Sequence, residues 1–384
     1  MTHEEPGFRC ENCGLPYPEE GVPHRCPRCG GVFRRARPLT WVPPDPNAKG
    51  MWRYRAAFPL PKDVPPVTLG EGATRLLPSE DEPGLWFKLE YENPTGSHKA
   101  RAASLTFTWL RARGVSAVVD DSSGNAGAAW AAYARAAGIP AHIFVPEGTH
   151  PAKQARIRAA GAQLTVVPGP RSAATEAAQQ AAQTSSAVYA SHAWLPIGLD
   201  AYATLAWEIV EQLGQAPGSV FVPVGHGALL VGLAEGFRAL LRAGQIARLP
   251  ALVGVQALAC APIWALARGG PEALLWVTEG ETVAEGVRVR QPVWGRHVLD
   301  AVQASQGALA AIDEPDILAA RDFLHRRGLY VEPTSALVWA AYTRLKTWAP
   351  KPAVLVLTGS PREQELWRAR ISRWWRRWRF RRNA

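Results

Sequence analysis

The stretch ENPTGSHKAR, residues 92–101, places one lysine, Lys99, in a turn of small residues. Further along, DSSGNA at residues 121–126 is a second run of small residues, and it opens an alanine-rich stretch typical of a helix. A lysine amine can condense with an aldehyde, and backbone amides at the start of a helix can bind an anion. Together the two segments predict a site for a ligand that carries both an aldehyde and an anionic group.

Lysine is rare in this chain, so Lys99 stands out. Only seven of the 43 basic residues are lysines, and arginine supplies the rest of the positive charge. An amine with a lowered pKa can act as a nucleophile near neutral pH, whereas a guanidinium keeps its proton. Taken alone, Lys99 could be an ordinary surface lysine. Its neighbours in the sequence favour a covalent bond to pyridoxal phosphate, which has both the aldehyde and the phosphate.

Both segments resemble those of the fold type II pyridoxal phosphate enzymes, and within them threonine synthase and its close relatives. The family's lysine segment commonly reads PTGSFKDR, and its lysine forms the Schiff base with the cofactor, a role that falls to Lys99. Here His98 replaces the phenylalanine and Ala100 the aspartate. The family's asparagine, here Asn125, would bond the ring hydroxyl of the cofactor. By the same resemblance, the substrate carboxylate would be held by the turn of Ser122, Ser123, Gly124, Asn125 and Ala126.

A third segment, SVFVPVGHGALLVGLAEGFRAL at Ser219–Leu240, is an apolar strand, a glycine turn and a helix. Such a turn presents amides to a phosphate, and the positive end of the helix favours the negative charge. Alone this pattern is weak evidence, but its order after Lys99 and Asn125 strengthens it. By resemblance, the cup for the cofactor phosphate consists of Gly225, His226, Gly227, Ala228 and Leu229. Threonine synthases often carry asparagine at the places of His226 and Leu229.

The fourth segment, AVLVLTGS at Ala353–Ser360, is a β-branched strand that ends in a small polar turn. In the family a threonine or serine there bonds the pyridine nitrogen, so we expect Thr358, or else Ser360, in this role. The alternative is a strand end with a purely structural turn. Residues 282–295 and 331–336 (VEPTSA) also resemble threonine synthase relatives, and we assign them no chemistry.

The order of strand-like and helical stretches predicts an α/β fold. Apolar runs at residues 115–119, 141–145 and 162–167 alternate with helical stretches from Asn125, Pro151 and Arg171. With the resemblance, this alternation predicts a fold type II enzyme with two open α/β lobes, mostly parallel sheets and ligands at the carboxyl ends of the strands. A nicotinamide-binding Rossmann unit is disfavoured, because no GxGxxG follows the first strand.

Four cysteines near the start form two CxxCG pairs separated by twelve residues, and they are Cys10, Cys13, Cys26 and Cys29. Paired thiolates on two tight turns can converge on one zinc ion, and a complete four-cysteine set indicates a structural Zn²⁺ site. A redox-active CxxC and a segment that has lost its metal are the alternatives. His24 is predicted to be a solvated side chain.

We expect a zinc ribbon at residues 1–35, an extended proline-rich connector at 36–66 and a catalytic region at 67–362. Within that region, the smaller lobe should span about residues 95–205 and the larger lobe the remainder. No signal peptide or long apolar run is evident, and thiols committed to metal suit a reducing compartment, so we expect a cytoplasmic homodimer.

A basic tail at residues 363–384 completes the chain. From Arg362 onward nine arginines oppose two glutamates, so this end carries +7 of the net charge of +10. Tryptophans alternate with the arginines, a pattern that can touch an anionic membrane or nucleic acid. The favoured interpretation is a segment docked on its own protein or on a partner subunit, with solvated arginines.

By resemblance, the reaction would convert O-phosphohomoserine and water to threonine and phosphate, with Lys99 as the base at the α-carbon. That substrate carries a second phosphate, and the arginine that commonly serves it in the family is replaced by Gly198. His192, His226 or Arg171 could compensate. A threonine or serine dehydratase is the first alternative. A zinc-ribbon binding protein with a vestigial cofactor site is the second.

Overall fold

The larger lobe is built on a six-stranded sheet in the order β11-β10-β9-β12-β4-β3, parallel except for the edge pair β3 and β4. The computed structural model describes residues 7–169 and 171–361. The strands are β3 (Leu76–Pro78), β4 (Leu85–Lys88), β9 (Ser219–Pro223), β10 (Ala251–Ala257), β11 (Ala308–Ile312) and β12 (Ala353–Val356). Strands buried on both faces read as continuous apolar runs, which explains the composition of β9, β10 and β12.

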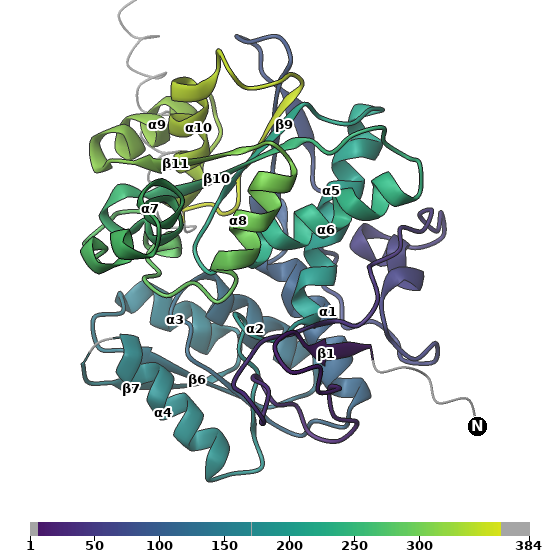
Figure 1. The fold of residues 1–384 in the computed structure, drawn as a ribbon. Coiled ribbons are helices and arrows are strands. Elements are labelled where there is room, and N and C mark those ends of the chain that lie inside the picture. Colours follow the sequence, from purple (N-terminus) through teal and green to yellow (C-terminus); the bar gives the residue numbers. More distant parts are fainter. Residues whose placement is uncertain (1–6, 170, 362–384) are drawn as a thin grey trace, which may run out of the picture.

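Helices cover both faces of this sheet (Figure 1). On one face, α10 (Pro333–Leu345) packs on the strands and α9 (Glu314–Arg326) packs on α10, while α5 (Ile197–Leu213), α6 (Ala228–Arg242) and α8 (Gly295–Ala304) cover the other. Side chains of β9 alternate accordingly, because Val220 and Val222 belong to the core beneath α5 and α6 and Phe221 to the core beneath α10. The shorter helices are α7 (Pro262–Gly269), η2 (Glu90–Glu92), η3 (Leu258–Cys260), η4 (Pro271–Trp276) and η5 (Glu285–Val287).

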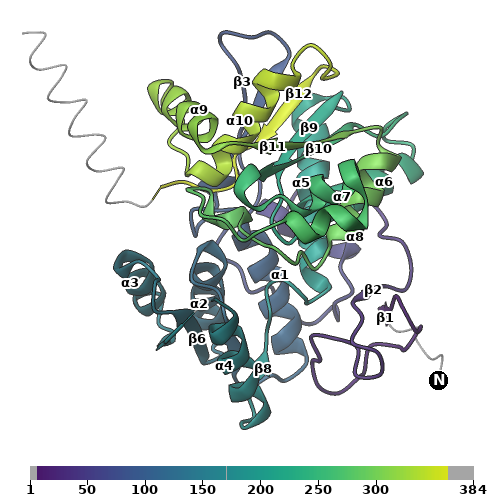
Figure 2. The same cartoon turned by 60° about the vertical axis from the view of Figure 1, so that its left-hand side comes forward.

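The smaller lobe has a four-stranded, wholly parallel sheet in the order β7-β6-β5-β8. Its elements are α1 (Lys99–Ala112), β5 (Val118–Asp120), α2 (Asn125–Ala137), β6 (Ala141–Pro146), α3 (Pro151–Ala159), β7 (Gln163–Val167), α4 (Arg171–Gln183) and β8 (Val188–Tyr189). In Figure 2 these elements lie below the larger sheet, with α1 between the two. The predicted alternation of parallel strands and helices is confirmed, as is the α/β fold class.

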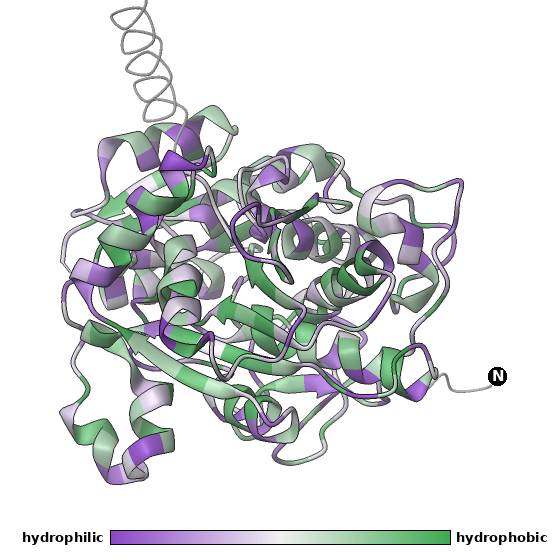
Figure 3. Cartoon of the chain, turned by 90° about the horizontal axis from the view of Figure 1, so that it is seen from above, coloured by the Kyte–Doolittle hydropathy of each residue, from purple (hydrophilic) through white to green (hydrophobic). Residues whose placement is uncertain are grey.

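Apolar side chains concentrate along the strands at the centre of the molecule, and polar ones on the outer loops (Figure 3). One continuous core joins α1, α2, α5, α6 and the N-terminal segment, so the two lobes share buried surface. None of the described helices is both long and apolar enough to cross a membrane. The basic tail predicted at 363–384 lies outside the described residues.

The connector differs from the extended segment that its prolines predict. Residues Gly50–Ala57 form the 3-10 helix η1, in which Met51, Trp52 and Tyr54 are buried in the main core. The indole of Trp52 donates hydrogen bonds to Glu71 and Ser104, at 2.7 and 3.0 Å. The prolines predict the conformation of the flanks of this segment only. Its centre is helical and packed against the core because three large side chains are buried there.

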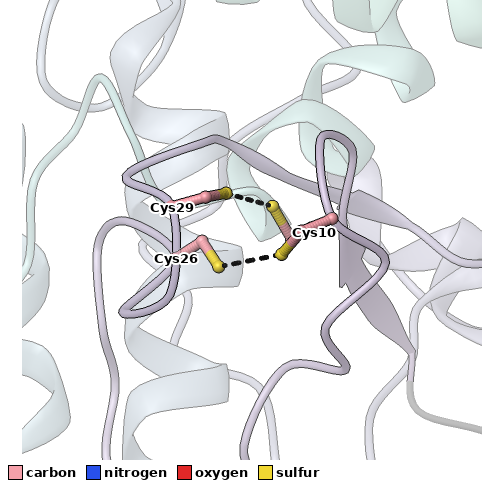
Figure 4. Close-up of side chains that lie close together, drawn as sticks. Cys10, Cys26 and Cys29 are labelled. Atoms are coloured by element: carbon pink, nitrogen blue, oxygen red, sulfur yellow. Dashed lines mark hydrogen bonds between the residues drawn. The ribbon is translucent and has the colours of Figure 1, made fainter.

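The four predicted zinc ligands converge at the N-terminal end, beside the short hairpin of β1 (Phe8–Cys10) and β2 (Phe33–Arg35). Their sulfurs lie within 4.8 Å of one another, and Figure 4 shows Cys10, Cys26 and Cys29 pointing toward one another. The separations of 3.4 Å (Cys10 to Cys29) and 3.6 Å (Cys13 to Cys26) are too long for disulfides. Four sulfurs placed about 2.3 Å from one zinc ion would lie roughly 3.8 Å apart, so the geometry fits this metal.

Each cysteine pair is held in a tight knuckle. Gly14 donates a backbone hydrogen bond to Cys10 and Gly30 donates one to Cys26, at 3.0 and 2.8 Å. Both glycines have positive φ, 71° and 70°, a conformation that other residues rarely adopt. The repeated glycine after each CxxC is therefore required by the turn itself.

The ribbon docks on the catalytic region through aromatic rings and ion pairs. Phe8 and Tyr17 contact Trp109 of α1 edge to face, and Arg35 pairs with the buried Asp200 of α5 at 2.9 Å. His24 is not the solvated side chain predicted from the sequence, because its half-buried ring packs against Tyr189 at 4.8 Å. The prediction was wrong because the contact comes from a residue remote in the chain.

A buried charge network joins the two lobes beside α1. Arg101 donates bidentate hydrogen bonds of 2.7 Å to Glu90 and also contacts both oxygens of Glu208 at 2.7 Å. Lys88 of β4 reaches Glu208 at 3.0 Å, and all four side chains are fully buried. Burial raises the pKa of Glu208, but Arg101 and Lys88 more than reverse this and hold it well below its usual range. The network therefore remains charged and fixes the first turn of α1.

Replacement of one cysteine tests the zinc site. We expect Cys13→Ser to lose bound zinc and to lower the melting temperature, because a three-thiolate site binds the metal more weakly and metal binding is coupled to folding of the ribbon. Zinc per chain is measured by mass spectrometry of the purified protein, and Cys260→Ala serves as the control because Cys260 is buried outside the cluster. Unchanged zinc in Cys13→Ser would exclude the four-thiolate site.

Replacement of Glu208 tests the charge network. Glu208→Gln keeps the shape but leaves Arg101 and Lys88 without one buried counter-charge, so the free energy of unfolding should fall by about 3–5 kcal/mol. Glu211→Gln, one turn along α5, is the control, because Glu211 pairs with Arg53 in a partly exposed position and should lose less than about 1 kcal/mol. Denaturant unfolding measures both variants. Equal losses of unfolding free energy in the two variants would mean that the buried network stabilises the fold no more than a partly exposed ion pair does.

Candidate active site

The predicted motif segments meet around one cavity between the two lobes, with a volume of about 1530 Å³. All thirteen residues predicted to bind cofactor or substrate line it, namely Lys99, Ser122 to Ala126, Gly225 to Leu229, Thr358 and Ser360. The loops after β5, β9 and β12 supply most of them. β9 and β12 are parallel neighbours in the larger sheet, and β5 lies in the parallel sheet of the smaller lobe, so the carboxyl ends of strands from both sheets deliver distant parts of the chain to the same cavity.

Lys99 is the first residue of α1 and faces the cavity. Burial lowers the pKa of its amine to about 8. Asp120 and Glu332 oppose this shift, and Arg171 adds to it. At pH 7 roughly a tenth of the amine is therefore uncharged, far more than at the ordinary pKa of 10.5, and the uncharged amine is the state that attacks an aldehyde.

The turn before Lys99 is anchored on the segment that follows β12. The backbone of His98 donates a hydrogen bond of 2.9 Å to the carbonyl of Thr358, and Ser97 and Gly359 form an isolated β-bridge. The His98 ring lies 3.2 Å from the same carbonyl, and burial lowers its pKa to about 3. His98 is thus a neutral packing residue, and Lys99 keeps its place although the family phenylalanine is missing.

Asn125 opens α2 and contacts a residue to which the sequence assigned no chemistry. Its amide donates hydrogen bonds of 3.0 Å to both carboxylate oxygens of Glu332, the N-cap residue of α10. A Cβ at Gly359 would lie 2.4 Å from Glu332 and 3.0 Å from the Asn125 amide nitrogen, so only glycine permits this contact. An acidic residue directly before a proline at a helix start is a weak signal, which explains why Glu332 was missed.

The turn between β9 and α6 has the form of an anion cup. Gly227, the N-cap of α6, has φ 95° and no side chain to cap the helix, so the amides of the first turn remain open to the cavity. A Cβ at Gly225 would lie 2.8 Å from the carbonyl of Gly286, and one at Gly227 would lie 2.6 Å from Val298. Both glycines are needed for the backbone to approach its neighbours closely.

Thr358 is buried and Ser360 is half-buried, and both line the cavity. The Thr358 hydroxyl lies 3.1 Å from the hydroxyl of Ser335 on α10, which also donates a hydrogen bond of 2.8 Å to the carbonyl of Gly359. Ser360 donates a backbone hydrogen bond to Gly96 at 3.2 Å. Thr358 is therefore the more firmly oriented of the two hydroxyls.

Beside Lys99, an imidazole is held by a buried carboxylate. The ring of His192 lies 3.1 Å from Asp120, the last residue of β5, and 6.1 Å from the ring of His226. Asp120 also accepts a hydrogen bond of 3.2 Å from the amide of Ser122, so it braces the predicted carboxylate turn. This aspartate precedes the DSSGNA segment by one residue and was not singled out in the sequence.

Gly198 does not face the cavity. It lies in the first turn of α5, and a Cβ there would meet Ala102 at 3.5 Å and Thr106 at 3.9 Å, both on α1. A longer side chain at this position would enter a helix interface. The cation that commonly serves the substrate phosphate in the family is thus absent from this place.

The residues present fit pyridoxal phosphate. The cavity offers an amine of lowered pKa, the amide of Asn125 oriented by Glu332, open helix amides at Ala228 and Leu229, and an oriented hydroxyl at Thr358. The Nδ1 atom of His226 is buried without a partner among the described residues, which is unfavourable unless a ligand atom meets it. These groups line one cavity, and each has the chemistry that one part of the cofactor requires: the aldehyde, the hydroxyl, the phosphate or the ring nitrogen.

Comparison with curated proteins finds threonine synthases along most of the chain. The threonine synthase of Methanocaldococcus jannaschii is 31% identical over 88% of this chain and 87% of its own. That of Mycobacterium leprae is 33% identical over 74% of this chain and 78% of its own.

Solved structures agree on the fold. A threonine deaminase of T.th. superposes with a TM-score of 0.62 at 27% identity, covering 73% of this chain and 88% of its own. The processed form of threonine deaminase isoform 2 from Solanum lycopersicum gives 0.65 at 20% identity, covering 87% and 97%. The family described as pyridoxal-phosphate dependent enzyme matches residues 67–359. With its lysine, asparagine, glycine cup and threonine gathered around one cavity, the chain belongs to the family of pyridoxal-phosphate dependent enzymes.

Proposed function

We propose that this protein is a pyridoxal-phosphate dependent lyase of the threonine synthase type, which converts O-phosphohomoserine and water to threonine and phosphate. The observation that carries the proposal is the meeting of all four predicted segments around Lys99 in one cavity. The threonine synthases at about 30% identity over most of the chain support the reaction type.

In this proposal each wall of the cavity has one task. Lys99 would hold the cofactor covalently, and its amine would also be the base that moves the proton at the α-carbon of the substrate. The amides of Ser122 to Ala126 would bind the substrate carboxylate, and Asn125, the glycine cup and Thr358 would fix the ring. When bound, pyridoxal phosphate supplies the electron sink for the carbanion at the α-carbon. The structural zinc of the four cysteines would stabilise the ribbon and take no part in the reaction.

A dehydratase acting on threonine or serine is the second candidate. Two observations favour it: no cationic side chain faces the cavity from position 198, and a threonine deaminase is among the similar structures at 27% identity. Such an enzyme needs no second phosphate site. The two reactions differ in product, because a dehydratase releases ammonia and a keto acid, and the proposed reaction releases phosphate.

Turnover by the purified holoenzyme tests the function directly. With O-phosphohomoserine we expect phosphate and threonine in equal amounts, measured by a phosphate assay and by amino-acid analysis. Lys99→Ala should lower the rate by at least about 100-fold, because both the covalent anchor and the base are lost. Lys346→Ala, at an exposed position directly after α10, should retain full activity. A keto acid formed from threonine or serine, without phosphate release from O-phosphohomoserine, would select the dehydratase.

The lowered pKa of Lys99 predicts the pH dependence of cofactor uptake. The amine must be neutral to attack the aldehyde, and the neutral fraction grows as the pH rises through about 8 instead of 10.5. The rate at which the apoprotein gains visible absorbance on mixing with cofactor should therefore increase with pH, reach half its maximum near pH 8 and level off above about pH 9. A midpoint near 10.5 would mean that the amine is not desolvated in the apoprotein.

A further inference from the structure

The cavity is lined by several cationic side chains, and most of them already have partners. Three of them bond groups of the protein: Lys153 with the carboxylate of Glu285, Arg156 with the carbonyl of Thr95, and Arg288 with the carbonyl of Glu279. Lys99 is assigned to the cofactor. Within residues 7–169 and 171–361, no hydrogen bond or ion pair involves the guanidinium of Arg171, which also lines the cavity.

Arg171 is the first residue of α4, on the side of the smaller lobe that carries β7. Nearby, Gly169 donates a backbone hydrogen bond of 3.2 Å to the carboxylate of Glu147. The side chain is half-buried. Its charge lowers the pKa of Lys99 and that of His226, so the guanidinium lies within electrostatic reach of both groups.

Arg171 acts electrostatically on Asp121, but the carboxylates of Asp120 and Asp121 form their hydrogen bonds with other groups. Asp120 uses one oxygen for His192 at 3.1 Å and the other for the amide of Ser122 at 3.2 Å. Asp121 accepts from the hydroxyl of Tyr189 at 3.0 Å and from that of Thr175. A guanidinium has five donors and no acceptor, so Arg171 keeps its donors for a ligand.

A second polar group on this side of the cavity also lacks a partner. The Nδ1 atom of His226 is fully enclosed, and no described residue bonds it. Burial, together with the charges of His192, Arg171 and Lys99, lowers the pKa of His226 well below its usual value, so the ring is neutral and can donate one hydrogen bond. Arg171 and His226 thus line the same cavity as Lys99, and if the cofactor phosphate meets His226, the guanidinium of Arg171 stays available for a second anion.

We propose that Arg171 binds the anionic group at the far end of the substrate and thereby selects phosphate esters over neutral hydroxy amino acids. This inference rests on the proposed function and names the residue that performs the task for which position 198 provides no cation. A planar guanidinium suits the phosphate oxygens, because it can donate two parallel hydrogen bonds. Arg171 would thus be a specificity-determining residue of the site.

The test compares three variants of the holoenzyme. Arg171→Gln removes the charge, Arg171→Lys keeps a point charge without the planar fork, and Arg248→Gln changes an exposed arginine outside the cavity as the control. Two quantities are measured: the Kd of inorganic phosphate by calorimetric titration, and kcat/KM for O-phosphohomoserine and for threonine. Visible absorbance of the bound cofactor and the melting temperature verify that each variant is folded.

Arg171→Gln should raise the phosphate Kd and lower kcat/KM for O-phosphohomoserine by roughly 10- to 100-fold, the effect of one lost charge-assisted contact. Any consumption of threonine should be unchanged, and Arg171→Lys should recover part of the loss. Arg248→Gln should match the wild type. An unchanged phosphate Kd, or an equal loss on both substrates, overturns the assignment of Arg171.

A failure of the proposed function can be told apart from a failure of the Arg171 assignment. If the wild type releases no phosphate from O-phosphohomoserine, the proposed reaction is wrong, yet the titration with inorganic phosphate still decides whether Arg171 binds an anion. If Arg171→Gln does not fold, Arg171→Lys takes its place, and a phosphate Kd equal to that of the wild type then contradicts the requirement for a planar guanidinium.

Discussion

The guanidinium of Arg101 is the contact on which the position of the site depends. It lies two residues after Lys99 on α1, fully buried, and bridges Glu90 beside the larger sheet and Glu208 on α5. A charge this deep is tolerated only when its hydrogen bonds are satisfied, so α1 cannot rotate or slide without breaking the network. The same helix turn carries the amine of Lys99 into the cavity. Because Arg101 holds the first turn of α1 rigidly, it also fixes the position of the Lys99 amine.

The cavity wall itself depends on loops that follow parallel strands. Because β9 and β12 of the larger sheet and β5 of the smaller sheet all end at the cavity, three short turns bring Asn125, Gly227 and Thr358 together without long excursions of the chain. At several of these turns the backbone packs directly against its neighbours, because glycine has no side chain to keep them apart. Gly359 is the clearest case, since any side chain there would displace Glu332 from Asn125. The site is therefore shaped as much by the absence of side chains as by the reactive groups.

Local patterns in the sequence predicted the strands and helices from Val118 to Gln183, because burial on both faces and alanine-rich helices leave clear signatures. The glycine turns and Lys99 were also predictable, since each belongs to a short motif. Glu332, Asp120 and Arg101 were not, because their partners lie far away in the chain and no local pattern encodes them. The role of Gly198 was equally hidden, as only the packing of α5 on α1 shows which way this position faces. The buried η1 helix within the proline-rich connector has the same origin.

The contacts of the N-terminal ribbon argue that it serves the catalytic region. A nucleic-acid-binding ribbon needs its basic and aromatic side chains exposed. Here Arg34 and Arg35 pair with Glu235 and Asp200, and the rings of Phe8 and Tyr17 are buried against α1. Glu11 reaches His297 on α8 at 2.6 Å, and the His297 ring packs on the ring of Trp294. The backbone amide of Trp294 donates a hydrogen bond of 2.9 Å to the carbonyl of His226 in the anion cup. The ribbon thus contacts helices of both lobes, and only His297 and Trp294 separate it from the glycine cup, so a metal bound there would stabilise the arrangement of the cavity from outside.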